Sequence, residues 1–133
     1  MGAACVVVHG QSPVEPVEPG TNLAAASCRD VDILAHPGEL TEDEAHLAAE
    51  NEVFIEITAK EGHCLGNGRV AQVAQAAGAK LVVSSDAHVP GQLLTEEFAR
   101  RVARMAGLEG EALEQTLVTN PQELLARAME RLK

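Results

Sequence analysis

Four short apolar runs stand out along the chain, separated by longer stretches that mix polar and apolar residues. Three of the runs are almost continuously apolar, and all are rich in Val, Ile or Leu. Near-continuous runs of this length are typical of parallel strands that are buried on both faces. We therefore predict four β-strands, at residues 4–8, 31–35, 53–58 and 80–84.

Helical patterns lie between and after these runs. Thr41 and Glu44 form a capping box, in which each side chain bonds to the backbone of the other residue at the start of a helix. Gly78 follows a segment with apolar residues at helical spacing and can end it. The spacing predicts helices near residues 22–28, 42–52, 67–77, 95–106, 111–118 and 121–132.

The last third of the chain has its own helix signals. After Thr95, Phe98, Val102 and Met105 recur at i, i+4 and i+7, which predicts the apolar side of a helix. Asn120 precedes a proline and, three residues on, a glutamate, so it is predicted to cap the final helix.

Strands that alternate with helices predict βαβ units and a parallel sheet, so the fold class is α/β. The length of 133 residues suits a single domain. With two Phe and no Tyr or Trp, the core must be built from Ala, Val and Leu. The proline-rich segment 12–22 is predicted to be an ordered loop that crosses the top of the sheet.

Charge and cysteine content narrow the class of protein. A net charge of −10 disfavours nucleic-acid binding, but it allows a small anionic substrate that is held by metal ions. Three cysteines without C-x-x-C spacing indicate reduced, mostly buried thiols rather than a disulfide framework or a zinc ribbon. The chain has no apolar run near the roughly 20 residues that span a membrane, and its start lacks the basic region of a signal peptide. We expect a cytoplasmic protein.

Histidines follow three of the four predicted strands. They are His9, His36 and His88, and Asp86 lies two residues before the last of them. The carboxyl ends of parallel strands meet at the edge where ligands bind. In extended geometry Asp86 and His88 would point to the same face. Three imidazoles and a carboxylate are ligands that suit a catalytic zinc, manganese or iron ion.

Each of these residues also has a structural interpretation. A single histidine after a strand is usually a hydrogen-bonded loop residue, and an aspartate there can simply cap a turn. His46 lies in an acidic helix and is expected at the surface, whereas His63 in a polar loop is a weaker ligand candidate. Glu56 can point into the site or pair with a basic side chain. The joint occurrence at strand ends favours the metal site.

Three segments together resemble a known family. VDILAHPG at residues 31–38, VFIEIT at 53–58 and AKLVVSSDAH at 79–88 are similar to the C-terminal part of the PHP (polymerase and histidinol phosphatase) family, and the ending TNPQELLARA resembles its closing helix. The resemblance implies a distorted (β/α)7 barrel with up to three metal ions that hydrolyses phosphate esters. The metal-ligand positions of the family fall on His9, His36, Asp86 and His88, of which Asp86 and His88 are our catalytic candidates.

The chain departs from this family at its start. The resemblance implies an opening strand with His-x-His, which this sequence lacks, and Gln11 stands where many relatives carry Glu. We therefore expect residues 1–133 to be one truncated domain, with about four strands of the barrel, that self-associates or pairs with a complementing N-terminal half. The leading hypothesis is a phosphoesterase for small phosphate monoesters that needs the remaining ligands for activity. The alternative is a non-catalytic metal-binding or assembly module.

Overall fold

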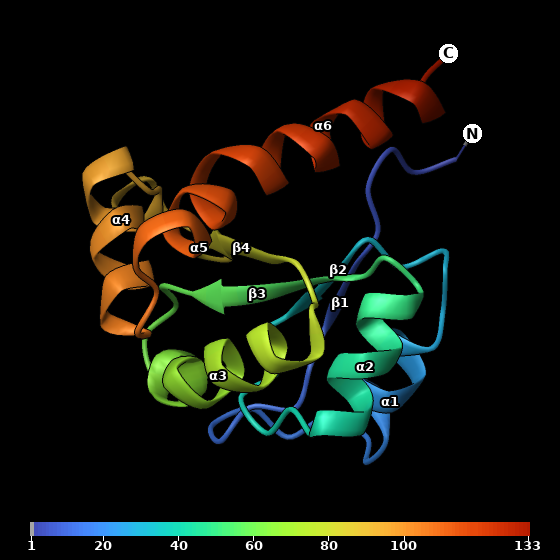
Figure 1. Ribbon diagram of the computed structural model, residues 1–133, viewed down its shortest axis with the longest axis horizontal. Coiled ribbons are helices and arrows are strands. Elements are labelled where there is room, and N and C mark those ends of the chain that lie inside the picture. The colour runs from blue at the N-terminus through green and yellow to red at the C-terminus, as the bar shows by residue number, and fades with distance from the viewer. Residues whose placement is uncertain (1) are drawn as a thin grey trace.

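The computed structural model describes residues 2–133, which form one four-stranded parallel sheet with flanking helices (Figure 1). The strands lie in the order of the chain, so that β1 and β4 are the two edges. Their bounds are Val7–His9 for β1, Ile33–Ala35 for β2, Phe54–Thr58 for β3 and Leu81–Ser84 for β4. The predicted α/β class with a parallel sheet is confirmed.

The first strand begins later than the apolar run predicts. The backbone N–H of Val6 donates to the buried carboxylate of Asp32 at 2.7 Å instead of to a strand neighbour. The Val6 carbonyl accepts from both Asp32 and Ile33. The regular ladder between β1 and β2 therefore starts only at the pairing of Val7 with Ile33.

The helices keep the predicted order, and several of their ends are confirmed. The capping box of Thr41 and Glu44 is present, Thr95 caps the helix that follows it, and Gly78 adopts a left-handed φ of 74° at a helix end. The helical elements are α1 (Thr21–Ala26), α2 (Glu42–Glu50), the 3-10 turn η1 (His63–Gly66), α3 (Asn67–Ala77), the 3-10 turn η2 (Pro90–Gln92), α4 (Glu96–Met105), α5 (Gly110–Glu114), the π-helical turn η3 (Gln115–Thr119) and α6 (Asn120–Arg131).

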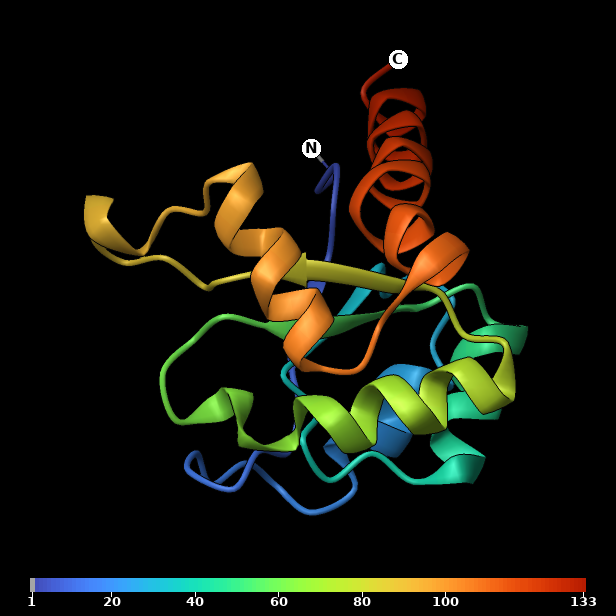
Figure 2. The ribbon, with the colours of Figure 1, turned by 60° about the vertical axis from the view of Figure 1, so that its left-hand side comes forward.

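The two faces of the sheet are covered by different helices. Helices α1, α2 and α3 lie together on one side, and α6 lies on the other (Figure 1 and Figure 2). Leu34, Ile55, Ile57 and Leu81 belong to the core formed with the first group, in which the helices contribute mainly alanine and valine. Small side chains allow the helices to approach the sheet closely, as the composition predicts.

The opposite face carries Phe54, Glu56 and Thr58, which alternate with Ile55 and Ile57 along β3. The Phe54 ring lies beneath the Arg127 guanidinium at 5.1 Å, a cation–π contact that helps seat α6 over this face. This face of β3 therefore combines the apolar Phe54 with the buried polar Glu56 and Thr58.

One expectation about the helices is wrong, and a second holds only in part. Asn120 does not cap α6, because α5, η3 and α6 run on with helical backbone angles, and its amide instead donates to the Leu81 carbonyl at 2.8 Å. Of the apolar side expected for α4, Val102 packs against the core, but Phe98 is 46 % and Met105 86 % exposed. The buried centre of this helix is instead Ala103.

The expected burial of the cysteines is also wrong. Cys5 and Cys64 are exposed and Cys28 is partly buried. Among the helices of residues 2–133, none combines the length and the apolarity that crossing a membrane requires.

Candidate metal centre

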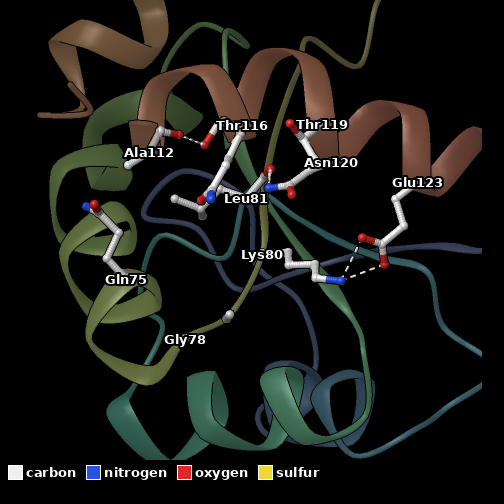
Figure 3. Close-up of a pocket in the computed structure, with 11 residues that line it drawn as sticks. Gln75, Gly78, Lys80, Leu81, Ala112, Thr116, Thr119, Asn120 and Glu123 are labelled. Carbon is white, nitrogen blue, oxygen red and sulfur yellow. Dashed lines mark hydrogen bonds and ion pairs between the residues drawn. The ribbon is translucent and has the colours of Figure 1, made fainter. Parts of the chain in front are cut away.

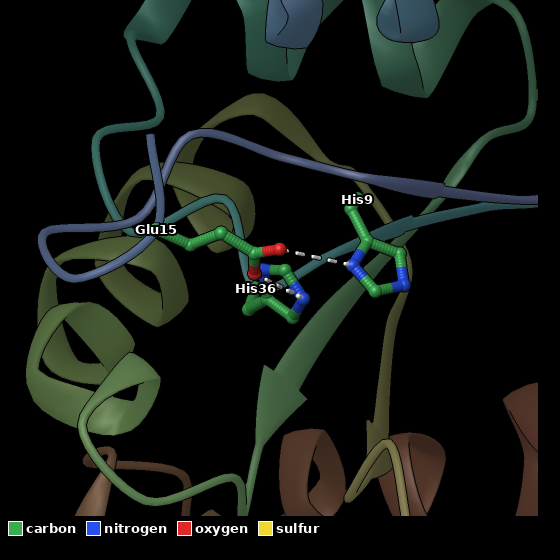
Figure 4. A group of neighbouring side chains, drawn as sticks. All are labelled: His9, Glu15 and His36. Atoms are coloured by element: carbon green, nitrogen blue, oxygen red, sulfur yellow. Dashed lines mark ion pairs between the residues drawn. The ribbon is translucent and has the colours of Figure 1, made fainter. Parts of the chain in front are cut away.

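Three imidazoles and a carboxylate meet at the carboxyl edge of the sheet. His9 ends β1, His36 follows β2, and His63 opens η1 after β3. Glu15 reaches them from the proline-rich loop, as Figure 4 shows for His9, Glu15 and His36. One ligand atom from each of these three residues lies within 4.8 Å of the others.

The Glu15 carboxylate lies between the rings. Its oxygens are 3.8 Å from His9 Nδ1, 3.9 Å from His36 Nε2 and 3.7 Å from His63 Nδ1. The His36 ring lies 4.8 Å from the His9 ring and 4.5 Å from the His63 ring, centroid to centroid. The ligand atoms of His9, Glu15 and His36 therefore share one space, at separations longer than direct hydrogen bonds. His63 lies beside this space, and its Nδ1 is bonded to Ser12.

The loop is held in place by contacts that span much of the sequence. Ser12 Oγ forms a 2.9 Å hydrogen bond with His63 Nδ1 and accepts the backbone N–H of Glu15 at 3.3 Å. The turn after β2 packs directly on η1. The two backbones are so close that a Cβ on Gly66 would lie 2.5 Å from the Cα of Gly38. These contacts bring Glu15, His36 and His63 together.

Several polar atoms of the cluster are buried without a partner. His36 is 1 % exposed, and neither its Nδ1 nor its Nε2 has a hydrogen-bond partner among the described residues. The same holds for Glu15 Oε2. Buried polar atoms are normally paired, because an unpaired one costs roughly 1–3 kcal/mol. Nitrogen and carboxylate donors that share a space without partners fit a bound divalent metal ion.

Burial and the neighbouring imidazoles favour the neutral form of the His36 ring. Burial lowers the pKa of His36, and its neighbours His63 and His9 lower it further. Burial likewise lowers the pKa of His63. A neutral imidazole keeps a free lone pair, which metal coordination requires.

Two residues of this edge have strained backbones. His36 has a φ of 34° and Asp86 a φ of 47°, a region that residues other than glycine rarely adopt. Such strain collects at functional sites, where the surrounding structure holds it. For Asp86 it also means that the extended geometry expected of Asp86 and His88 is wrong.

Glu56 supports the cluster through hydrogen bonds with His36 and Ser84. One of its carboxylate oxygens accepts the backbone N–H of His36 at 2.6 Å, and the other accepts the hydroxyl of Ser84. Burial raises the pKa of Glu56, and these two hydrogen bonds oppose the rise. Glu56 thus fixes the backbone of His36, and among the described residues it forms no ion pair with a basic side chain.

The residues predicted after β4 lie at the rim. The Asp86 carboxylate accepts a hydrogen bond from Lys60 Nζ at 2.5 Å, which lowers the pKa of Asp86. His88 is exposed, and its Nδ1 lies 2.7 Å from the Asp86 carbonyl oxygen. The structure therefore brings His9 and His36 together but leaves Asp86 and His88 outside their group.

Sequence reasoning missed Glu15 and underrated His63. His46 is exposed on α2, as expected. The signal for Glu15 was indirect: the loop around it was predicted to cross the edge of the sheet, but the repeat in VEPVEP does not tell Glu15 from Glu18. Only the folded structure shows that Glu15 is the glutamate beside His9 and His36.

A second hollow lies at the amino end of β4, away from the histidines, and holds about 490 Å³ (Figure 3). Glutamine, threonine and asparagine account for five of its eleven lining residues, and Lys80 pairs with Glu123 at 2.6 Å. Its polar groups include Asn120 and Thr116, which are engaged with backbone carbonyls. Among residues 2–133, no buried polar atom without a hydrogen-bond partner belongs to the lining of this hollow, in contrast to the histidine cluster.

Comparisons with known proteins identify one similar protein but indicate no activity for this chain. No family model matches the chain. An uncharacterized protein of Methanocaldococcus jannaschii is 47 % identical over 127 residues, which are 96 % of this chain and 58 % of that protein. The chain thus spans less than two thirds of the length of the curated relative it matches. No solved structure matches it.

Proposed function

We propose that this chain carries a divalent metal site of a PHP-type phosphoesterase, which hydrolyses small phosphate monoesters. The observation that carries the proposal is the buried His36 ring, whose two nitrogens lack partners beside an equally unpaired Glu15 oxygen. In the proposal His36, His9, Glu15 and His63 hold the ion. The resemblance of the strand-end segments to PHP proteins supports the reaction type and the wider (β/α)7 barrel.

The type of ligand supports a catalytic rather than a structural role. Imidazoles with a carboxylate are typical of catalytic zinc, manganese or iron, whereas structural zinc is usually bound by cysteines. When bound, such an ion lowers the pKa of a coordinated water and offsets charge on phosphoryl oxygens.

The neighbouring residues have supporting tasks in this proposal. Ser12 orients His63 through their hydrogen bond, and Glu56 holds the backbone of His36. Partners that orient metal ligands in this way strengthen metal binding. Their loss typically lowers the metal affinity by a factor of about 10–100. Asp86 and His88 remain proposed ligands from the end of β4, where they are close to the solvent.

Metal analysis of the purified chain tests the site. We expect bound zinc, manganese or iron in the wild type, and its loss in His36→Gln and His9→Gln. His46→Gln is the control, because His46 is exposed on α2. Equal metal content in the wild type and in His36→Gln would contradict the proposal.

A phosphatase assay with added manganese then separates the enzyme from its alternative. Hydrolysis of a phosphate monoester that is lost in His36→Gln supports the phosphoesterase. Bound metal without turnover supports a non-catalytic metal-binding module, and turnover that survives Asp86→Ala argues against a role for Asp86.

A further inference from the structure

Lys60 is the basic side chain at the edge of the sheet that carries the histidine cluster. It follows β3 by two residues, and its backbone N–H donates to Thr58 Oγ1 at 3.1 Å. The preceding Ala59 N–H donates to the Ser84 carbonyl at 2.8 Å. The backbone around Lys60 is therefore anchored to both β3 and β4, while its side chain stays 26 % exposed.

The ammonium group has spare capacity for an anion. Within the described part of the chain, its Nζ donates to one acceptor, Asp86 Oδ2. An ammonium group has three donors, so two remain for another partner. The bond to Asp86 raises the pKa of Lys60, so the side chain keeps its charge at neutral pH.

The charges around Lys60 explain why a cation is needed here. The chain has a net charge of −10, and the negative charges of Glu15, Glu56 and Asp86 all raise the pKa of Lys60. A phosphate monoester would meet these carboxylates as it approached the histidines. Charge-assisted hydrogen bonds to phosphate are among the strong ones in proteins, and Lys is a common phosphate binder.

A hollow of about 210 Å³ adjoins Lys60 at the same edge, between the ends of β3 and β4. Its lining mixes the half-exposed Phe98 with polar Ser85 and Gln92, and the acidic Glu61 also lines it. This space suits the organic group of a small ester whose phosphate lies at Lys60.

We infer that Lys60 binds a phosphoryl oxygen of the substrate, and so selects phosphorylated over neutral small molecules. The identity of this anion rests on the proposed phosphoesterase function. In this role Lys60 keeps its contact with Asp86 and uses one of its remaining N–H donors for the phosphate.

Titration with inorganic phosphate tests this inference, with calorimetry or ³¹P NMR as the readout on both the metal-free and the metal-loaded protein. Loss of a charge-assisted hydrogen bond in Lys60→Met should weaken phosphate binding by about tenfold or more. Lys60→Arg should restore most of it. Lys80→Met is the matched control, because Lys80 also pairs with a carboxylate but lies by the hollow at the amino end of β4.

The inference is overturned if the wild type binds no phosphate, if Lys60→Met binds it as tightly as the wild type, or if Lys80→Met loses as much. Circular dichroism verifies that Lys60→Met is folded, and rescue by Lys60→Arg excludes a general loss of structure. The proposed function fails separately: in that case the chain holds no metal, yet phosphate binding still depends on Lys60.

Discussion

At the residue scale, His36 combines burial, backbone strain and two unpaired ring nitrogens. Glu56 holds its N–H, so the ring is presented to His9, Glu15 and His63 from a fixed backbone. The strained backbone and the buried, unpaired ring nitrogens would each destabilise the folded protein on their own. Together they describe a position that is suited to a ligand rather than to stability.

Glu15 offers a sharp test of the metal site, because the same loop provides its control. Glu15→Gln should weaken zinc or manganese binding by at least about tenfold, since even the partners of metal ligands matter by that factor. Glu18→Gln changes the equivalent, exposed position of the Val-Glu-Pro repeat and should leave the affinity unchanged. Competition with a fluorescent chelator measures both, and similar affinities for the two variants would exclude Glu15 as a ligand.

At the element scale, the turn η3 lets the chain pass from α5 into α6 without a break. Thr116 donates to the Ala112 carbonyl within this run, and Asn120 reaches across to Leu81 at the start of β4. Asn120, which looks like a helix cap in the sequence, therefore links α6 to the sheet through a hydrogen bond. π-helical turns are rare overall, and those that occur lie mostly inside longer helices, as η3 does.

Asn120→Ala should lower the free energy of unfolding by about 1–3 kcal/mol, because the Leu81 carbonyl would lose its buried partner. Urea denaturation measures the change. Gln122→Ala, at an exposed position of α6, is the control and should stay within about 0.5 kcal/mol. Equal stability of both variants would show that Asn120 has no such role.

At the scale of the whole molecule, Asp32 joins the two ends of the chain. Its buried carboxylate accepts the Val6 N–H and pairs with Arg131 at 2.5 Å, while Arg127 lies 3.7 Å away. Helix α6 is thereby tied to β2 and to the segment before β1. The sheet face that carries Glu56 and Phe54 depends on this docking.

Asp32→Asn should destabilise the protein by about 1–3 kcal/mol, since a charged acceptor of hydrogen bonds is lost, and the partial exposure of Arg131 limits the effect. Asp30→Asn, an exposed neighbour, should be nearly neutral. Thermal unfolding compares the two. A destabilised Asp30→Asn with an unchanged Asp32→Asn would contradict the proposed tie.

The sequence by itself determined the α/β class, the four strands, most helix ends and the placement of His9 and His36 at one edge. These follow from short-range causes, namely hydrophobic periodicity, capping residues and the rule that parallel strands end together. Only the tertiary structure decided that Glu15 rather than Glu18 joins the histidines, that Lys60 pairs with Asp86 and that Asn120 serves the sheet. The Ser12–His63 and Lys60–Asp86 contacts join residues 51 and 26 positions apart, so no local pattern records them.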